Sequence, residues 1–164
     1  MLITIRRAKD EDETIFKVLT TKLRNFNRNN HHNNNAIDDD SEFVIASIKR
    51  KTEEIFRNRN EESLILIADC DGQAVGYAVG IIYKEAETAD NGTGIMGLLD
   101  ELFVDDLARG FGIGNKLIDQ TLEWLKEEGI NRVKLHAYSW NTKAKKHYER
   151  KGFKEYAVSY EKYI

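Results

Sequence analysis

Three glycines at alternate positions, Gly110, Gly112 and Gly114, follow an apolar run that ends at Val104. They open a segment whose apolar residues recur at the spacing of a helix. Glycine inside a helix costs about 1 kcal/mol relative to alanine, but it suits a backbone that comes close to a ligand. Unpaired N–H groups at a helix start bind anions. The spacing therefore predicts a phosphate-binding loop, although a Gly-x-Gly on its own is more often a tight turn.

The loop fits neither of two common nucleotide-binding patterns. Its glycines are spaced G-x-G-x-G, whereas the dinucleotide fingerprint is G-x-G-x-x-G. No Gly-Lys-Ser/Thr ends the loop, so it is not a Walker loop.

Size and composition predict one soluble domain over residues 1–164. The chain is 41% hydrophobic and 32% charged, and no apolar run approaches the roughly 18 residues of a membrane span. The net charge of -3 disfavours a nucleic-acid partner. Cys70 is the single cysteine, which excludes an internal disulfide and favours a cytoplasmic setting. His31 and His32 are interpreted as exposed side chains of a polar loop and not as metal ligands. No metal is therefore expected.

The elements that must position the glycine loop follow from apolar periodicity and turn residues. Strands are predicted at residues 2–6, 63–69, 73–82, 98–104, 131–138 and 153–160, and helices at 10–23, 41–57, 113–128 and 142–151. Asp71-Gly72 predicts a hairpin turn. The polar stretches 25–40 and 83–94 are predicted as loops, the first of them mobile without substrate. The fold class is α/β (an α+β mixed sheet) with helices on both faces.

Three motifs in this order resemble the GCN5-related N-acetyltransferases, also called the GNAT family. They are the strand that ends at Val104, the loop Arg109-x-x-Gly112-x-Gly114, and Asn141-x-x-Ala144-x-x-x-Tyr148-x-x-x-Gly152-Phe153. The run from Asp100 to Val104 is most similar to the diamine/polyamine N-acetyltransferase branch. This chain has Asp105-Asp106 where that family usually has a proline in the turn.

The resemblance implies a GNAT-like fold, with a mostly antiparallel central sheet splayed at the cofactor strand, and acetyl-CoA as cosubstrate. The backbone of the cofactor strand would pair with the pantetheine arm, the loop would hold the pyrophosphate, and Arg109 would position it. Asn141 would lie near the pantetheine, or cap the last helix. The implied cofactor-binding residues are Leu102, Phe103, Val104, Arg109, Gly110, Phe111, Gly112, Ile113, Gly114, Asn115, Asn141, Ala144 and Tyr148.

The same resemblance implies three catalytic candidates. Tyr148 would protonate the leaving thiolate as a general acid. Asp100 and Glu101 would attract a cationic amine and take its proton, or else be solvated or paired with a lysine. Since neighbours on a strand point to opposite faces, only one of the two is expected to face the substrate.

The predicted function is N-acetyl transfer to a primary amine of a small molecule, with a polyamine as one candidate. One alternative is acetylation of a protein amine, at an N-terminus or a lysine. Another is a non-catalytic acyl-CoA-binding domain. The apolar and aromatic C-terminus predicts a homodimer.

Overall fold

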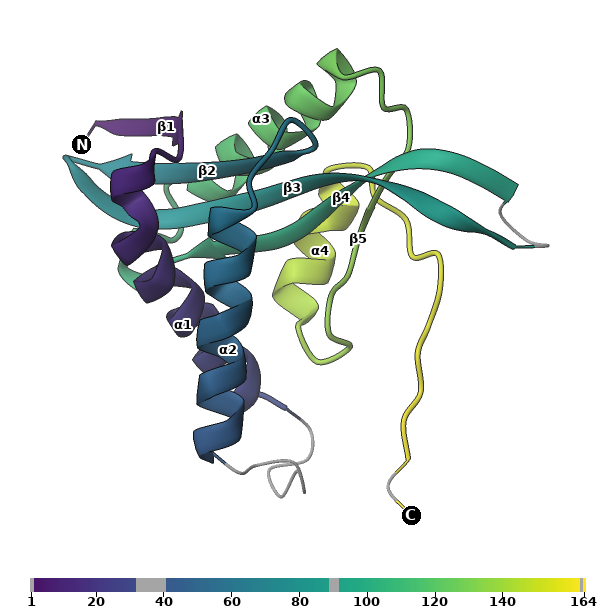
Figure 1. Cartoon of the computed structure of the whole chain (residues 1–164), viewed down its shortest axis with the longest axis horizontal. Helices are drawn as coiled ribbons and strands as arrows, with labels where there is room; N and C mark the ends of the chain where they lie inside the picture. Colours follow the sequence, from purple (N-terminus) through teal and green to yellow (C-terminus); the bar gives the residue numbers. More distant parts are fainter. Residues whose placement is uncertain (1, 32–40, 89–91, 163) are drawn as a thin grey trace.

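The structure, a computed structural model, describes residues 2–31, 41–88, 92–162 and 164, and in these it forms one mixed five-stranded sheet (Figure 1). The spatial order is β1-β2-β3-β4-β5, with β1 to β4 antiparallel and β5 parallel to β4. The strands are β1 (Ile3–Arg7), β2 (Ser63–Cys70), β3 (Gln73–Thr88), β4 (Gly92–Val104) and β5 (Val133–Leu135). The predicted mixed sheet is confirmed.

Helices cover both faces of the sheet, as predicted. Helices α1 (Glu13–Asn29) and α2 (Ser41–Arg57) lie on one face, where Phe16 and Phe56 join a buried cluster. Helix α3 (Ile113–Glu127) packs on the other face, over a second buried cluster. Helix α4 (Thr142–Arg150) contributes Tyr148 to the edge of this second cluster. Two short 3-10 turns complete the elements, η1 (Asp10–Asp12) and η2 (Asp106–Ala108). The sheet therefore separates two buried cores.

Two features fix the central strands: the tight turn between β2 and β3, and the close packing of α3 on β3 and β4. Asp71 and Gly72 have φ values of 50° and 85°, which is the left-handed pair that a two-residue hairpin requires. A Cβ at Gly80 would come within 2.8 Å of the Thr121 side chain, and one at Gly97 within 2.8 Å of Leu125. Helix α3 therefore packs closely against the sheet at Gly80 and Gly97.

Residues 83–88 and 92–94, which had been predicted as part of a loop, are strand; residues 89–91 lie outside the described residues. Strand β3 continues to Thr88 and β4 begins at Gly92, and the two pair as far as Thr88 opposite Gly92. They project as a long arm beyond the rest of the sheet (Figure 1). Polar composition misled the prediction because a two-stranded arm is held by its backbone ladder and does not need a buried face.

The first helix begins and ends later than predicted. Asp12 turns its carboxylate back to accept from Lys9 N (2.7 Å) and from Arg6, so that residues 10–12 form a 3-10 turn. Helix α1 then runs through residues 25–29, which had been predicted as loop. Most of that predicted loop, residues 32–40 with His32, lies outside the described residues.

The C-terminal segment is not the predicted strand. Phe153 N donates to Tyr148 O (3.1 Å), and residues 154–162 then run extended with no backbone hydrogen bond to the described part of the chain. Strand β5 is also shorter than predicted, with three residues in place of eight. The 153–160 pattern alternates like a strand, but no sheet edge in the described part of the chain pairs with it.

Candidate functional site

The glycine loop ends at the N-terminus of α3 as predicted. Gly110 and Gly112 have φ values of 88° and 76°, a region that favours glycine, and Gly112 is the N-cap residue. Lys116 N donates to Gly112 O (3.1 Å) as the helix begins, so the preceding N–H groups lack intrahelical acceptors. The Ile113 side chain is 1% exposed and anchors this end in the core. The loop therefore presents a row of donors on a rigid helix end.

Gly114 is not explained by packing within the chain. A Cβ there would meet His147 Nε2 at 3.8 Å and Val104 Cγ2 at 3.9 Å, which are ordinary contacts. Its conformation is helical, with no positive φ. Since alanine would be better by about 1 kcal/mol in a helix, the open space at Gly114 fits a bound group.

Strands β4 and β5 separate beside this loop. They pair at Gly97, Leu98 and Leu99, and the pairing ends there. Asp105 N donates to Val75 O (2.8 Å) on the β3 side, so by alternation the backbone groups of Leu102 and Val104 face the open side. The predicted splay is confirmed, and it leaves backbone donors and acceptors of β4 without a strand partner on that side.

Arg109 occupies part of this open edge. Its Nε donates to Val104 O (3.0 Å), and its guanidinium lies 2.5 Å from Asp106 and 5.3 Å from the centre of the Phe26 ring. The sequence predicted Arg109 as a residue that positions a ligand. In the structure it holds the end of β4 against the loop and α1.

The two adjacent carboxylates share one face, contrary to the prediction. Glu101 lies opposite Val79 and Leu99 lies opposite Gly80, so Asp100 is the extra residue of a β-bulge. Tyr77 donates to Glu101 Oε2 (2.7 Å) and Arg24 donates to Oε1. The charges that act on Asp100 come from Arg24, from Lys51 on α2 and from His136. The bulge breaks the alternation on which the prediction rested.

Glu101 is a structural group because both its oxygens are already bonded. Its side chain is 4% exposed, and that of Arg24 is 28% exposed. We expect Glu101→Gln to lower the free energy of unfolding by about 2–3 kcal/mol, since it leaves Arg24 without its counter-charge. Urea denaturation monitored by tryptophan fluorescence measures this. A loss below about 0.5 kcal/mol would contradict the structural role, because even one ordinary hydrogen bond contributes that much.

Asp100 is the carboxylate left available. It is exposed, and it makes no hydrogen bond or ion pair with the residues that the structure describes. Withdrawal of solvent by the surrounding elements raises its pKa above the ordinary value, partly offset by the charges of Arg24, Lys51 and His136. This group lies at the point where β4 leaves β5.

Helix α4 carries the remaining predicted residues. Asn141 Oδ1 accepts from Ala144 N (3.2 Å), which confirms the N-cap prediction. The Tyr148 ring packs 6.1 Å from Phe153, and burial raises the pKa of its hydroxyl. That hydroxyl makes no hydrogen bond with any described residue. A neutral phenol with an unused hydroxyl can donate a proton.

Aromatic side chains gather around the loop before α4. The Trp140 ring stacks on Tyr138 at 5.5 Å and lies 5.7 Å from Phe26 at the end of α1. Trp140 Nε1 is buried and has no hydrogen-bond partner within the described residues. A buried indole N–H without an acceptor is costly, so it is a donor that a ligand can satisfy.

The other predicted site residues differ in how far their side chains are exposed. Phe103 is 7% exposed and faces Tyr77 in the α1/α2 core, so only its backbone can reach a ligand. Phe111 is 53% exposed and Asn115 is exposed on the loop. Sequence reasoning missed the residues that surround these, because their contacts join distant segments: Arg24, Tyr77, His136 and His147.

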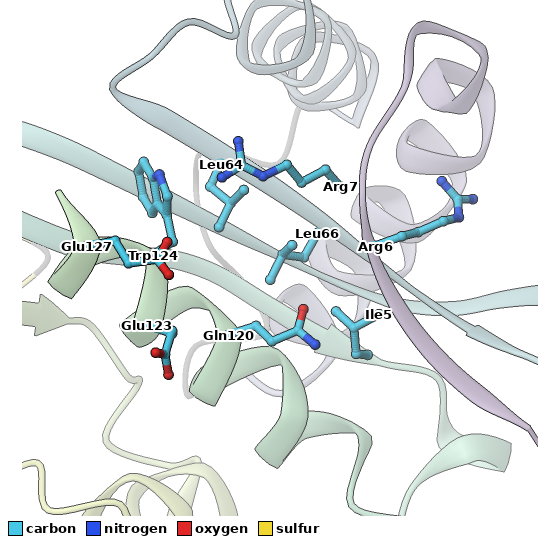
Figure 2. Close-up of a pocket in the computed structure, with 9 residues that line it drawn as sticks. All are labelled: Ile5, Arg6, Arg7, Leu64, Leu66, Gln120, Glu123, Trp124 and Glu127. Atoms are coloured by element: carbon cyan, nitrogen blue, oxygen red, sulfur yellow. The ribbon is translucent and has the colours of Figure 1, made fainter.

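A groove of about 290 Å³ lies elsewhere, between β1, β2 and α3 (Figure 2). Ile5, Leu64, Leu66 and Trp124 line it with the α3 side chains Gln120, Glu123 and Glu127. None of these was a predicted site residue. The chemistry-bearing groups gather instead at the glycine loop and the β4–β5 split.

Two further observations concern ligand classes. Among the described residues no three His, Cys, Asp or Glu side chains come together as a metal site, and His31 lies 3.6 Å from Glu161. In the same part of the chain no helix is long and apolar enough to cross a membrane.

Comparison with known proteins identifies the family to which this chain is similar. Residues 27–153 match the model of the acetyltransferase (GNAT) family. The chain is 27% identical over 155 residues to the uncharacterized N-acetyltransferase YhfO of Bacillus subtilis (strain 168), covering 93% of this chain and 91% of that protein.

Solved structures share the fold. A predicted acetyltransferase from Clostridium acetobutylicum, solved with acetyl-CoA, superposes with a TM-score of 0.70 at 20% identity, over 99% of this chain and 96% of that one. The structure of AAC(6')-Iy with the bisubstrate analogue CoA-S-monomethyl-acetylneamine superposes with a TM-score of 0.72 at 20% identity, over the whole of both chains. Since the family match spans most of the sequence, this chain belongs to the acetyltransferase (GNAT) family and is an N-acetyltransferase.

Proposed function

We propose that this enzyme acetylates a primary amine of a small cationic molecule, with a polyamine as a candidate, and that acetyl-CoA is the donor. One observation carries the choice of acceptor. The bulge in β4 sets Asp100, an exposed carboxylate that bonds to none of the described residues, where β4 and β5 part. A protonated amine is the group that such a carboxylate attracts.

The residues at the split fit acetyl-CoA. The donors before Lys116 and the space over Gly114 suit a pyrophosphate. The open backbone groups of Leu102 suit the amides of a pantetheine arm, and Val104 would join them once Arg109 releases its carbonyl. Bound there, acetyl-CoA supplies a thioester whose carbonyl carbon accepts the amine nitrogen and whose sulfur leaves as a thiolate.

Two residues of the chain then handle protons. A primary alkylamine has a pKa near 10.4, so it arrives as an ammonium and must lose a proton before it can attack. Asp100 holds the ammonium and receives that proton, directly or through water. Once the amine nitrogen has bonded to the carbonyl carbon, Tyr148 donates its hydroxyl proton to the sulfur as the C–S bond breaks. The nitrogen then gives up its second proton to the Tyr148 oxygen, directly or through water, so that the products are the amide and the CoA thiol. Glu101 takes no part, since Tyr77 and Arg24 already occupy it.

One solved structure of the same fold and a group of aromatic side chains favour a small cationic amine as the acceptor. AAC(6')-Iy, which shares the fold, has been solved with the bisubstrate analogue CoA-S-monomethyl-acetylneamine. Here the aromatic rings of Tyr138, Trp140 and Phe26 cluster before α4, and aromatic faces attract cations.

The test is release of free CoA thiol from acetyl-CoA with a panel of acceptors. The panel is spermidine, spermine, putrescine, lysine, an aminoglycoside and a basic peptide. We expect turnover with a polyamine or aminoglycoside to exceed that with the peptide by at least tenfold in kcat/KM. A preference for the peptide would overturn the proposal in favour of a protein amine.

Replacing Asp100 tests how the acceptor is held. We expect Asp100→Asn to lower kcat/KM for the best amine by about 10²-fold, the lower end of the contribution of a general base. The wild-type rate should fall on acidification through the raised pKa of Asp100, because only the ionised carboxylate accepts a proton. In the variant this fall of the rate at low pH, the acidic limb of the pH profile, should be absent.

Glu123→Gln is the matched control for that variant. It removes an exposed carboxylate from α3, in the groove of Figure 2, and should leave kcat/KM and the acidic limb unchanged. If Asp100→Asn keeps kcat/KM within threefold of wild type, Asp100 has no catalytic role.

A further inference from the structure

His147 on α4 lies beside the open space at the glycine loop. A Cβ at Gly114, in the first turn of α3, would lie 3.8 Å from His147 Nε2 and 3.9 Å from Val104 Cγ2. One ring nitrogen of His147 therefore lies close to the place where β4 ends and α3 begins. A group that rests against the backbone of Gly114 comes within hydrogen-bonding reach of this nitrogen.

The imidazole has no bonding partner within the described part of the chain. The side chain is partly buried, and neither ring nitrogen makes a hydrogen bond or an ion pair with any residue that the structure describes. Its ring contact is with the neighbouring Tyr148, at 6.0 Å between ring centres. A neutral imidazole has one N–H donor and one acceptor nitrogen, so His147 keeps an unused donor next to the loop.

The charged groups around the ring do not occupy it. Arg150 and Lys151 follow it on the chain, and Asp119 acts on it from α3. Lys151 Nζ already donates to both carboxylate oxygens of Asp119, at 2.6 and 2.8 Å. Burial and then the charges of Arg150 and Lys151 lower the pKa of His147, and Asp119 offsets part of this effect. The imidazole is therefore neutral at neutral pH in the absence of a bound anion.

We propose, on the basis of the function proposed above, that His147 is a binding residue for acetyl-CoA and that its Nε2 donates a hydrogen bond to a phosphate oxygen of the pyrophosphate at Gly114. A negative charge near a histidine favours the protonated ring. The bound pyrophosphate therefore raises the pKa of His147, and the ring takes up a proton from solvent as the cofactor binds. Protonation turns a neutral hydrogen bond into a charge-assisted one, which is stronger.

This coupling gives the affinity a defined dependence on pH. Because the pKa of His147 is higher with the anion bound than without it, the affinity rises as the pH falls through the bound-state pKa, and it levels off below the free-state pKa. Dephospho-CoA is the suitable probe. It keeps the pyrophosphate and lacks the 3′-phosphate, whose own ionisation near pH 6 would add a second pH dependence.

Calorimetric titration with dephospho-CoA tests the contact. We expect wild type to bind at least fivefold more tightly at pH 6 than at pH 8, with a binding heat that changes with the protonation enthalpy of the buffer. His147→Leu should bind about tenfold more weakly than wild type at pH 8, and its affinity should differ less than twofold between the two pH values. His147→Gln keeps a neutral donor, so it should regain part of the affinity at pH 8 and none of the pH dependence.

His31→Leu is the matched control, because it removes another partly buried histidine, next to the end of α1. It should keep the wild-type affinity at both pH values. If His147→Leu keeps both the affinity and the pH dependence of wild type, His147 does not bind the cofactor. Gly114→Asp in the same series separates this result from a failure of the proposed site. Weakened binding in Gly114→Asp would leave the pyrophosphate at this helix end and overturn the role of His147 alone, whereas unchanged binding in both variants would overturn the site as well.

Discussion

Tyr148→Phe is expected to lower kcat by about 10²-fold or more while leaving the affinity for CoA within twofold of wild type. General acid catalysis contributes 10²–10⁴-fold, and the variant removes the hydroxyl that protonates the leaving sulfur. The ring is kept, so its packing against Phe153 is kept as well. Steady-state release of CoA thiol and calorimetric titration of CoA measure the two quantities.

Folding stability separates this effect from damage to the structure. The Tyr148 hydroxyl makes no hydrogen bond with the described residues, so its removal should change the free energy of unfolding by less than about 0.5 kcal/mol. Tyr77→Phe is the matched control, because its hydroxyl donates to buried Glu101 at 2.7 Å. That variant should lose about 1–2 kcal/mol of stability and keep kcat within threefold. A Tyr148→Phe enzyme with kcat within threefold of wild type would falsify the general-acid assignment.

The pH profile supplies a second signature. Burial raises the pKa of Tyr148 above 10.0, so the phenol is protonated throughout the neutral range. Loss of the proton should lower kcat only at pH values above 10, and this alkaline limb should vanish in Tyr148→Phe. The acidic limb set by Asp100 should persist in that variant.

Local sequence was sufficient where a short pattern fixes the backbone. Gly110 and Gly112 adopt positive φ, and Asn141 caps α4, as their types and positions indicate. The hairpin at Asp71-Gly72 follows for the same reason. Each of these features depends on residues within a few positions of one another, so no knowledge of the fold was needed.

The face of the sheet to which each of the two carboxylates points could not be predicted, because it depends on strand register. Asp100 and Glu101 would point to opposite faces in a regular strand. They share a face because β3 and β4 slip by one residue between Val79 and Gly80, and this slip is a property of the pair of strands. Likewise Arg24 reaches Glu101 across 77 positions of sequence. The sequence therefore identified two carboxylates but not which one is free.

Strand predictions failed where pairing, and not pattern, decides. Residues 83–88 are polar and still form a strand, since β4 supplies their ladder. Residues 153–160 have the alternation of a strand and form none within one copy. Both errors have one cause: a strand exists only with a neighbouring strand to pair with, and the sequence of the segment itself does not reveal that neighbour.

Gly114 gives the sharpest test of the anion site, because folding and ligand binding should respond to it in opposite directions. It lies in the first turn of α3, where a negative side chain stabilises the helix dipole by about 0.3–1 kcal/mol and any non-glycine residue removes part of the glycine cost. The nearest atoms to an added Cβ are 3.8 and 3.9 Å away, so the fold has room for it. A bound pyrophosphate would compete for this room.

Gly114→Asp is therefore expected to weaken CoA binding by about 10²-fold or more and to leave the protein as stable as wild type or slightly more so. Two unit charges about 5 Å apart at an effective dielectric constant near 20 repel by about 3 kcal/mol, which is a factor of about 10² in affinity. Calorimetric titration of CoA and urea denaturation measure the two effects. Gly114→Asn, of equal size without the charge, should lose less affinity, and the difference should shrink at high salt. Gln120→Asp places the same charge nearly two turns further along α3, at an exposed position, and should leave the affinity unchanged. Equal losses for Asp and Asn would mean that size alone excludes CoA. Unchanged affinity in Gly114→Asp would place the pyrophosphate away from this helix end.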